Sequence, residues 1–178
     1  MYIVAPSHRS YFDTPFASFI TRRRIRFMAK EELFKNSFGA KLFLALGGIP
    51  VKRGSDSARS ATKAVEAALR AGEPAAVFPE GTRANGPDIA PLFDGTAYLA
   101  VKLGCPIVPV AIGGSEEILA SGKKLPKLHR VSMKVGAPIM PPPDASTRRR
   151  SDLVAVSDEL MKSLQTLFNA ANAEAGVT

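Results

Sequence analysis

Residues 75–83 read AAVFPEGTR, an apolar run that ends in a turn with one acidic and one basic side chain. A strand of continuous apolar residues is typical of a parallel sheet covered by helices on both faces. Pro79 and Gly81 are turn residues that end such a strand. Because open α/β sheets bind ligands at the carboxyl ends of their strands, this turn is a candidate binding site.

Apolar runs of strand length alternate with segments of helical period in the rest of the chain. Strands are predicted at Tyr2–Ala5, Ile25–Ala29, Ile49–Val51, Ala75–Phe78, Ile107–Ile112 and Val131–Val135. Helices are predicted at Pro15–Thr21, Phe38–Leu46, Ser57–Ala71, Thr96–Leu103 and about Ser151–Ala173. This order predicts an α/β layered sandwich with a mixed, largely parallel sheet flanked by helices, and the last helix is expected to pack on the same domain.

Several residues indicate where these elements begin and end. Thr14 and Pro15 are suited to the N-cap and first position of a helix. Gly72 and Gly104 stand where the glycine that follows a helix is expected. Pro109 lacks a backbone donor, so the strand that contains it is predicted to be an edge strand or to carry a bulge.

Composition limits the classes of protein to which the chain can belong. Its 178 residues are 46% hydrophobic and 22% charged, as in a globular domain. The net charge of +8 favours anionic partners such as nucleic acid, phosphorylated metabolites or acidic lipid headgroups. A single cysteine excludes an intrachain disulfide framework. Because there are also only two histidines, no metal site is expected. The longest apolar stretch, 42–51, is far shorter than the roughly 20 residues of a transmembrane helix.

The first candidate site is SHRSYFD, residues 7–13. Five residues of a regular helix turn about 500°, so His8 and Asp13 meet only if the backbone bends between them. An aspartate that accepts a hydrogen bond from one imidazole nitrogen fixes the tautomer and leaves the other nitrogen free as a base. In the alternative interpretation, His8 is a solvated loop residue and Asp13 caps a helix.

Two further strand ends carry cations. The segment GGIPVKRG at 47–54 places Arg53 before a helix start, where backbone donors suit phosphate, although Arg53 could also be simply solvated. In the turn at 79–83, Arg83 can bind phosphate bidentately, Gly81 lets a ligand approach the backbone, and Glu80 can accept hydrogen bonds. The alternative there is a tight turn with a local pair between Glu80 and Arg83.

Four segments of this chain resemble, in the same order, the sequence blocks of the 1-acylglycerol-3-phosphate acyltransferases, a family of glycerolipid acyltransferases. They are HxxxxD at 8–13, the block ending in Arg53, FPEGTR at 78–83 and PIVPV at 106–110. The resemblance implies one domain with the glycerolipid acyltransferase fold over residues 1–178. It implies an enzyme that moves a fatty acyl group from acyl-CoA or acyl carrier protein to the free hydroxyl of 1-acylglycerol-3-phosphate, giving phosphatidic acid.

The resemblance also assigns roles to residues. His8 would be the general base and Asp13 the residue that orients it, with direct acyl transfer and no cofactor beyond the thioester co-substrate. The acceptor phosphate and glycerol would be bound by Arg53, Glu80, Gly81, Thr82 and Arg83. Glycerol-3-phosphate and other lysophospholipids are alternative acceptors.

A lipid substrate implies a peripheral location on the cytoplasmic side of the cell membrane, against an anionic surface. The arginines at 22–26 and the apolar segment 38–46 are the candidate contacts, since each cation near anionic lipid contributes about 1 kcal/mol. The alternatives are a solvated turn for 22–26 and a buried helix for 38–46, and for 38–46 burial is favoured.

Two other classes of protein are disfavoured by the sequence. A basic nucleic-acid-binding module is the alternative from a different class, but aromatic residues are few, and neither an RNP-like nor a zinc-finger pattern occurs, so no nucleic acid partner is expected. The segment GGSEE at 113–117 lacks the second glycine of the GxSxG motif of serine hydrolases.

Overall fold

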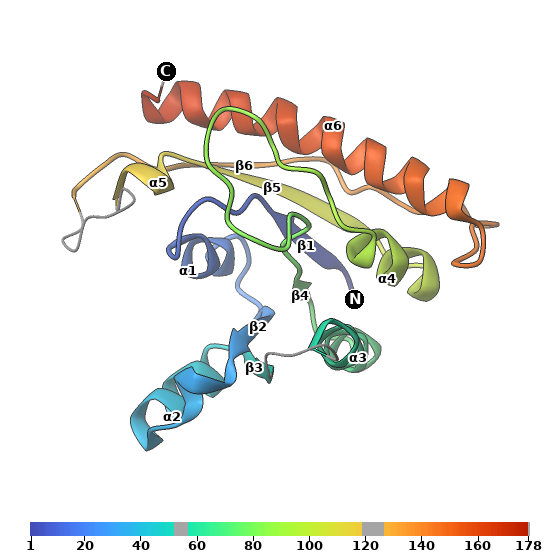
Figure 1. The fold of residues 1–178 in the computed structure, drawn as a ribbon, viewed down its shortest axis with the longest axis horizontal. Coiled ribbons are helices and arrows are strands. Elements are labelled where there is room, and N and C mark those ends of the chain that lie inside the picture. Colours follow the sequence, from blue (N-terminus) through green and yellow to red (C-terminus); the bar gives the residue numbers. More distant parts are fainter. Residues whose placement is uncertain (52–56, 119–126, 178) are drawn as a thin grey trace.

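The computed structural model describes residues 1–51, 57–118 and 127–177 (Figure 1). The strands are β1 (Ile3–Pro6), β2 (Arg26–Lys30), β3 (Gly48–Val51), β4 (Ala75–Ala76), β5 (Ile107–Gly113) and β6 (Ser132–Val135). The helices are α1 (Asp13–Ser18), the 3₁₀ helix η1 (Glu31–Phe34), α2 (Ser37–Ala45), α3 (Ser57–Arg70), α4 (Gly95–Leu103), α5 (Ser115–Ile118) and α6 (Arg150–Ala175).

The strands form one sheet in the order β3-β2-β4-β1-β5-β6. All neighbouring pairs are parallel except β5 and β6, which are antiparallel. Helices cover both faces of this sheet. The prediction of a mixed, largely parallel sheet flanked by helices is therefore confirmed.

Successive residues of the central strand β1 point to opposite faces of the sheet, as in any strand. Ile3 packs in a cluster with α3, α4 and α6, whereas Val4 packs in a second cluster with Ala17 of α1. Both strand residues are fully buried. The sheet thus holds β1 between two apolar layers and fixes where its carboxyl end emerges.

The C-terminal helix α6 lies along β5 and β6 (Figure 1). One face of the helix is buried, at the helical spacing that a single apolar stripe requires. Its buried residues are Leu153, Val156, Leu160, Leu164, Phe168, Ala171 and Ala175. This stripe supplies much of the core beneath the sheet.

Pro109 does not mark an edge strand, because β5 pairs with β1 on one side and with β6 on the other. Its carbonyl accepts a hydrogen bond from Gly136 N at 2.9 Å. The carbonyl and nitrogen of one strand residue point to the same side, so the missing donor faces Gly136, just beyond the end of β6. Beyond Pro109 the pairing resumes between Ile107 and Ile139, with residues 136–138 opposite residues 108 and 109, which is the extra residue of a bulge. The proline therefore lies at an irregularity of the kind that the second alternative predicted.

Helix α1 begins at Asp13, one residue before the predicted N-cap Thr14. Pro15 is therefore the third helical residue, where its missing N–H would have had no partner within the helix in any case. The expected glycine end of α4 is confirmed, since Gly104 adopts the left-handed conformation with φ 59°.

The expectation that residues 38–46 form a buried helix is wrong. In α2, Phe38 is 79% and Leu42 44% exposed, and Leu46, just after the helix, is 51% exposed. Among the described residues, α2 packs through one side, with Phe43 against Phe34 of η1 at a ring distance of 5.7 Å. The helix projects from the β2–β3 end of the sheet (Figure 1).

Within the described residues, no helix combines the length and apolar character needed to cross a membrane.

We predict that Leu164→Ala, which empties a fully buried position on α6, lowers the free energy of unfolding by about 2–5 kcal/mol. Val154→Ala is the control on the same helix, since Val154 is 38% exposed, and should change it by no more than about 0.5 kcal/mol. Urea denaturation followed by circular dichroism measures both. Equal stability of the two variants would contradict the packing of α6 on the sheet.

Candidate active site

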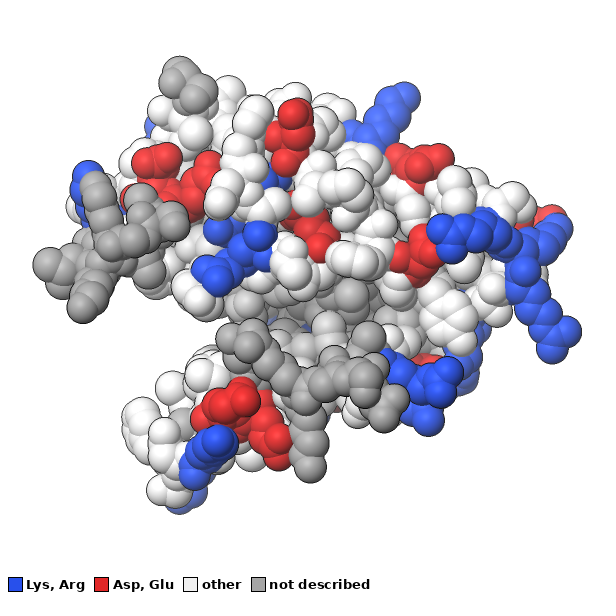
Figure 2. All heavy atoms as spheres, viewed as in Figure 1, with Lys and Arg blue, Asp and Glu red and all other residues white. Residues whose placement is uncertain are grey.

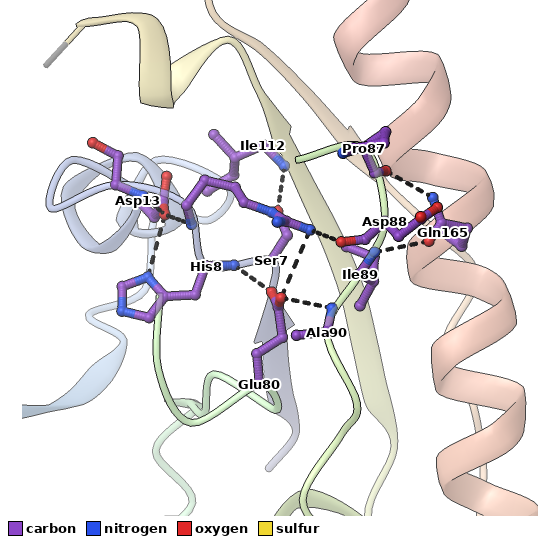
Figure 3. A network of polar contacts seen from close by, with 12 residues as sticks. Ser7, His8, Asp13, Glu80, Pro87, Asp88, Ile89, Ala90, Ile112 and Gln165 are labelled. Atoms are coloured by element: carbon purple, nitrogen blue, oxygen red, sulfur yellow. Dashed lines mark hydrogen bonds and ion pairs between the residues drawn. The ribbon is translucent and has the colours of Figure 1, made fainter. Parts of the chain in front are cut away.

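Three loops meet where neighbouring parallel strands end. They follow β1, β4 and β5, and β1 lies between the other two in the sheet. Carboxyl ends of parallel strands emerge at one edge of a sheet, so residues far apart in the chain converge there. Figure 3 shows the polar contacts that connect these loops.

Asp13 is the fully buried acidic centre of this edge. Its Oδ2 accepts hydrogen bonds from His8 Nδ1 at 3.2 Å, Arg9 N at 2.5 Å and Ser10 N at 2.6 Å. The backbone bends between β1 and α1, as the pairing requires. The structure thus brings together His8 and Asp13, and the carboxylate also orders the backbone of the intervening loop.

The contact with Asp13 defines the tautomer of His8. An ionised carboxylate only accepts hydrogen bonds, so Nδ1 carries the proton and Nε2 is the basic nitrogen. The ring lies 4.2 Å from that of Phe78, and the His8 side chain is 20% exposed. His8 is therefore fixed on one side and accessible on the other, unlike a solvated loop histidine.

Glu80 is buried, with 2% of its surface exposed. Its Oε1 accepts a hydrogen bond from His8 N at 2.7 Å, and its Oε2 accepts one from Ala90 N at 3.0 Å (Figure 3). The carboxylate thus holds the main chain of His8, and it does not face solvent. Glu80 makes these contacts instead of the local pair with Arg83, which donates to Tyr11.

The turn after Glu80 lies at the surface. Gly81, Thr82 and Arg83 are exposed, and Gly81 has φ 66°. The Arg83 guanidinium lies 3.6 Å above the ring of Tyr11 and donates to its hydroxyl at 2.9 Å. Because Tyr11 belongs to the His8–Asp13 loop, these contacts hold Arg83 against the outside of that loop.

The structure does not place every predicted site residue. Arg53, the predicted phosphate ligand at the end of β3, lies outside the described residues.

Arg9 is a site residue that sequence reasoning missed. It is 4% exposed, ion-paired with Glu80 at 3.7 Å, and stacked at 4.5 Å over Phe168 of α6. Its Nη2 donates to Asp88 O at 2.6 Å. The bond to Asp88 joins the His8 loop to the loop before α4, and the stacking on Phe168 joins it to the C-terminal helix. A buried arginine next to a histidine leaves no recognisable signal in one sequence.

Ser115 was also missed as a site residue. It is fully buried after β5, and its hydroxyl donates to Asp13 Oδ1 at 2.6 Å. In serine hydrolases the serine bonds to the imidazole and the acid bonds to its other side. Here the serine bonds to the acid, so the arrangement does not support a serine nucleophile.

An apolar cavity of about 520 Å³ lies beside the turn at Gly81. Its lining includes Met28 of β2, Val65 of α3, Leu99 of α4, and Val77, which follows β4. Polar groups contribute little to this lining, so an aliphatic chain is the kind of ligand that the cavity suits.

Among the residues that the structure describes, no cluster of three or more histidine, cysteine, aspartate or glutamate side chains could hold a metal ion. Cys105 is buried, and burial raises the pKa of its thiol. Burial also raises the pKa of the Glu116 carboxyl, which follows Ser115, while Arg9 opposes that shift. His8, Asp13 and Glu80 are therefore the groups whose geometry defines the site.

Comparisons with known proteins agree with this architecture. A family model described as Acyltransferase matches residues 1–113. The chain is 28% identical to the 1-acyl-sn-glycerol-3-phosphate acyltransferase of Bacillus subtilis, over 94% of this chain and 81% of that protein. It is 25% identical to the human 1-acyl-sn-glycerol-3-phosphate acyltransferase alpha, over 94% of this chain but 58% of that protein.

The crystal structure of the 1-acyl-sn-glycerophosphate (LPA) acyltransferase PlsC from Thermotoga maritima has the same fold, with a TM-score of 0.70 and 28% identity. The alignment covers 93% of this chain and 65% of that one, so the chain spans about two-thirds of that relative. Since the family model covers well over half of its residues, the chain belongs to the acyltransferase family.

Proposed function

We propose that this chain is a 1-acylglycerol-3-phosphate acyltransferase that takes the acyl group from a thioester of coenzyme A or acyl carrier protein and forms phosphatidic acid. The observation that carries the proposal is the buried Asp13 carboxylate on His8 Nδ1, because it leaves Nε2 as the basic nitrogen of a side chain that is 20% exposed. The names of the relatives support the choice of acceptor. The relatives that match most of this chain are named as 1-acyl-sn-glycerol-3-phosphate acyltransferases.

In the proposed reaction, His8 Nε2 takes the proton of the acceptor hydroxyl while its oxygen attacks the thioester carbonyl. The new C–O bond forms, the C–S bond breaks, and the imidazolium returns the proton to the departing sulfur. Positioned proton transfer of this kind contributes about 10²- to 10⁴-fold to a rate. Asp13 stabilises the imidazolium, and transfer is direct, without an acyl-enzyme.

We assign separate roles to the residues of the turn after β4. Glu80 positions His8 by accepting a hydrogen bond from the backbone N–H of His8. Both oxygens of the Glu80 carboxylate already accept hydrogen bonds from backbone groups of the protein. Arg83 contacts the acceptor phosphate from the surface beside the His8–Asp13 loop, and Gly81 and Thr82 supply exposed backbone next to it. Arg53 is the proposed second cation. The apolar cavity next to Gly81 accommodates an acyl chain.

We place the membrane-contacting surface on α2 and the arginine turn before β2. The exposed side chains of Phe38, Leu42 and Leu46 supply the apolar part, and Figure 2 shows acidic as well as basic side chains on the arm that α2 forms with η1. A Cβ at Gly47 would lie 3.1 Å from Arg24 Cγ, so the exposed arginines at 22–24 adjoin the end of α2. Cations beside apolar side chains suit the anionic cytoplasmic leaflet.

Replacing the base tests the mechanism. His8→Ala is expected to lower kcat by about 10²- to 10⁴-fold, because the proton acceptor is lost, while the protein stays folded. Mass spectrometry of lipid products, with a panel of acyl thioesters and lysolipid acceptors, measures this loss and identifies the preferred substrates. Near-normal turnover by a folded His8→Ala protein would contradict the proposed base.

Replacing the exposed guanidinium tests the phosphate site. Arg83→Ala is expected to raise KM for 1-acylglycerol-3-phosphate by about 10- to 100-fold, since a charge-assisted hydrogen bond is lost. KM for a phosphate-free monoacylglycerol should not change. The control is Arg70→Ala, which removes an arginine that pairs with Glu66 on α3. Arg53→Ala is assayed alongside, and unchanged acceptor KM in both site variants would place the phosphate elsewhere.

The membrane surface is tested with vesicles. Phe38→Ala combined with Leu42→Ala is expected to weaken binding to phosphatidylglycerol-containing vesicles by about tenfold or more, because burying each side chain in lipid is worth about 1.5–3 kcal/mol. Met140→Ala, which removes a 58% exposed side chain just after the bridge of Ile139 to β5, is the control. Co-sedimentation measures binding, and unchanged binding by the double variant would remove α2 from the membrane surface.

A further inference from the structure

The two oxygens of Asp13 have unequal surroundings. Oδ2 accepts from three donors, and His8 Nδ1 is the longest of these contacts at 3.2 Å. Oδ1 accepts from Ser115 Oγ at 2.6 Å, across 102 residues of sequence. Both side chains are fully buried, so water does not replace this donor without a change in packing.

The position of Ser115 is set by the turn that precedes it. A Cβ at Gly113 would lie 2.5 Å from the backbone of Ala171 and Asn172 in α6. Gly114 has φ 78°, and a Cβ there would lie 2.4 Å from Arg130 O. The chain therefore passes directly over the backbone of α6, and this contact fixes the point from which Ser115 reaches Asp13.

A carboxylate held at one oxygen can still rotate about its Cβ–Cγ bond. With Oδ1 bound, that rotation is blocked and Oδ2 stays opposite His8 Nδ1. Without it, only the donors at Oδ2 restrain the carboxylate, and any rotation moves Oδ2 relative to His8 Nδ1, whose contact is already the longest of the three. Imidazole with no acceptor at Nδ1 also populates the tautomer whose Nε2 carries the proton and cannot act as a base.

We propose that Ser115 is a positioning residue for acyl transfer, which locks the Asp13 carboxylate so that His8 keeps Nε2 as its basic nitrogen. The proposal rests on the proposed function of His8. Ser115 does not touch substrate; it acts through Asp13, and α6 acts through Ser115. The C-terminal helix thereby takes part in setting the geometry of a histidine near the start of the chain.

Kinetics of three variants test the proposal. Ser115→Ala is expected to lower kcat by about 10- to 100-fold, while KM for both substrates stays within about threefold of the parent value. Residues that orient a functional side chain through a hydrogen bond have effects of this size. Ser115→Thr keeps the hydroxyl and should restore kcat to within about threefold of the parent. Ser132→Ala is the matched control, because its hydroxyl, also on a buried residue, donates to Glu174 and not to Asp13.

A spectroscopic readout separates positioning from general stability. Long-range ¹H–¹⁵N NMR of the His8 ring is expected to show the Nδ1–H tautomer in the parent protein and in Ser115→Thr, and a mixture of tautomers in Ser115→Ala. Ser132→Ala should leave this spectrum unchanged even where it lowers the melting temperature.

The proposal is overturned if folded Ser115→Ala retains kcat within twofold and an unchanged His8 tautomer. If Ser115→Ala does not fold, Ser115→Cys decides, because its thiol keeps the shape but is a weaker donor. It should lose kcat, and parental turnover in that variant would refute the role. His8→Ala, assayed in parallel, separates the two hypotheses, since an active His8→Ala enzyme refutes the proposed function itself.

Discussion

A carboxylate without exposed surface is stable in a protein only when donors surround it. Asp13 has four such donors, from the imidazole of His8, the backbone of Arg9 and Ser10, and the hydroxyl of Ser115. They come from the loop after β1 and the turn after β5. Closing this shell requires the two strands to be in register, so correct pairing of β1 with β5 and assembly of the candidate site are one event.

Glu80 repeats this arrangement on the opposite side of the same loop. Its buried carboxylate accepts from His8 N and Ala90 N, and Gln165 of α6 accepts from Ile89 N at 2.8 Å next to it. His8 is consequently held twice, by its ring and by its main chain. Two buried acids that each bind backbone donors give a preorganised loop, which a reaction that depends on the position of one proton requires.

Local patterns predicted those parts of the fold that local chemistry determines. The alternation of strands and helices follows from residue periodicity, and Gly104 ends α4 because few other residues adopt positive φ. The edge-strand alternative for Pro109 and the burial of residues 38–46 were wrong for a different reason. Where β6 stops, and whether any element covers α2, depend on distant parts of the chain. A pattern within ten residues does not contain that information.

The same limit divides the candidate site. His8 and Asp13 could be paired from the sequence because one bend connects them, and the turn that carries Glu80 and Arg83 does contact their loop. The direction in which Glu80 points depends on a donor 72 residues away, and the contact of Ser115 spans 102 residues. Sequence spacing therefore finds residues that share a loop, whereas buried partners that orient them become visible only once the sheet has brought the strand ends together.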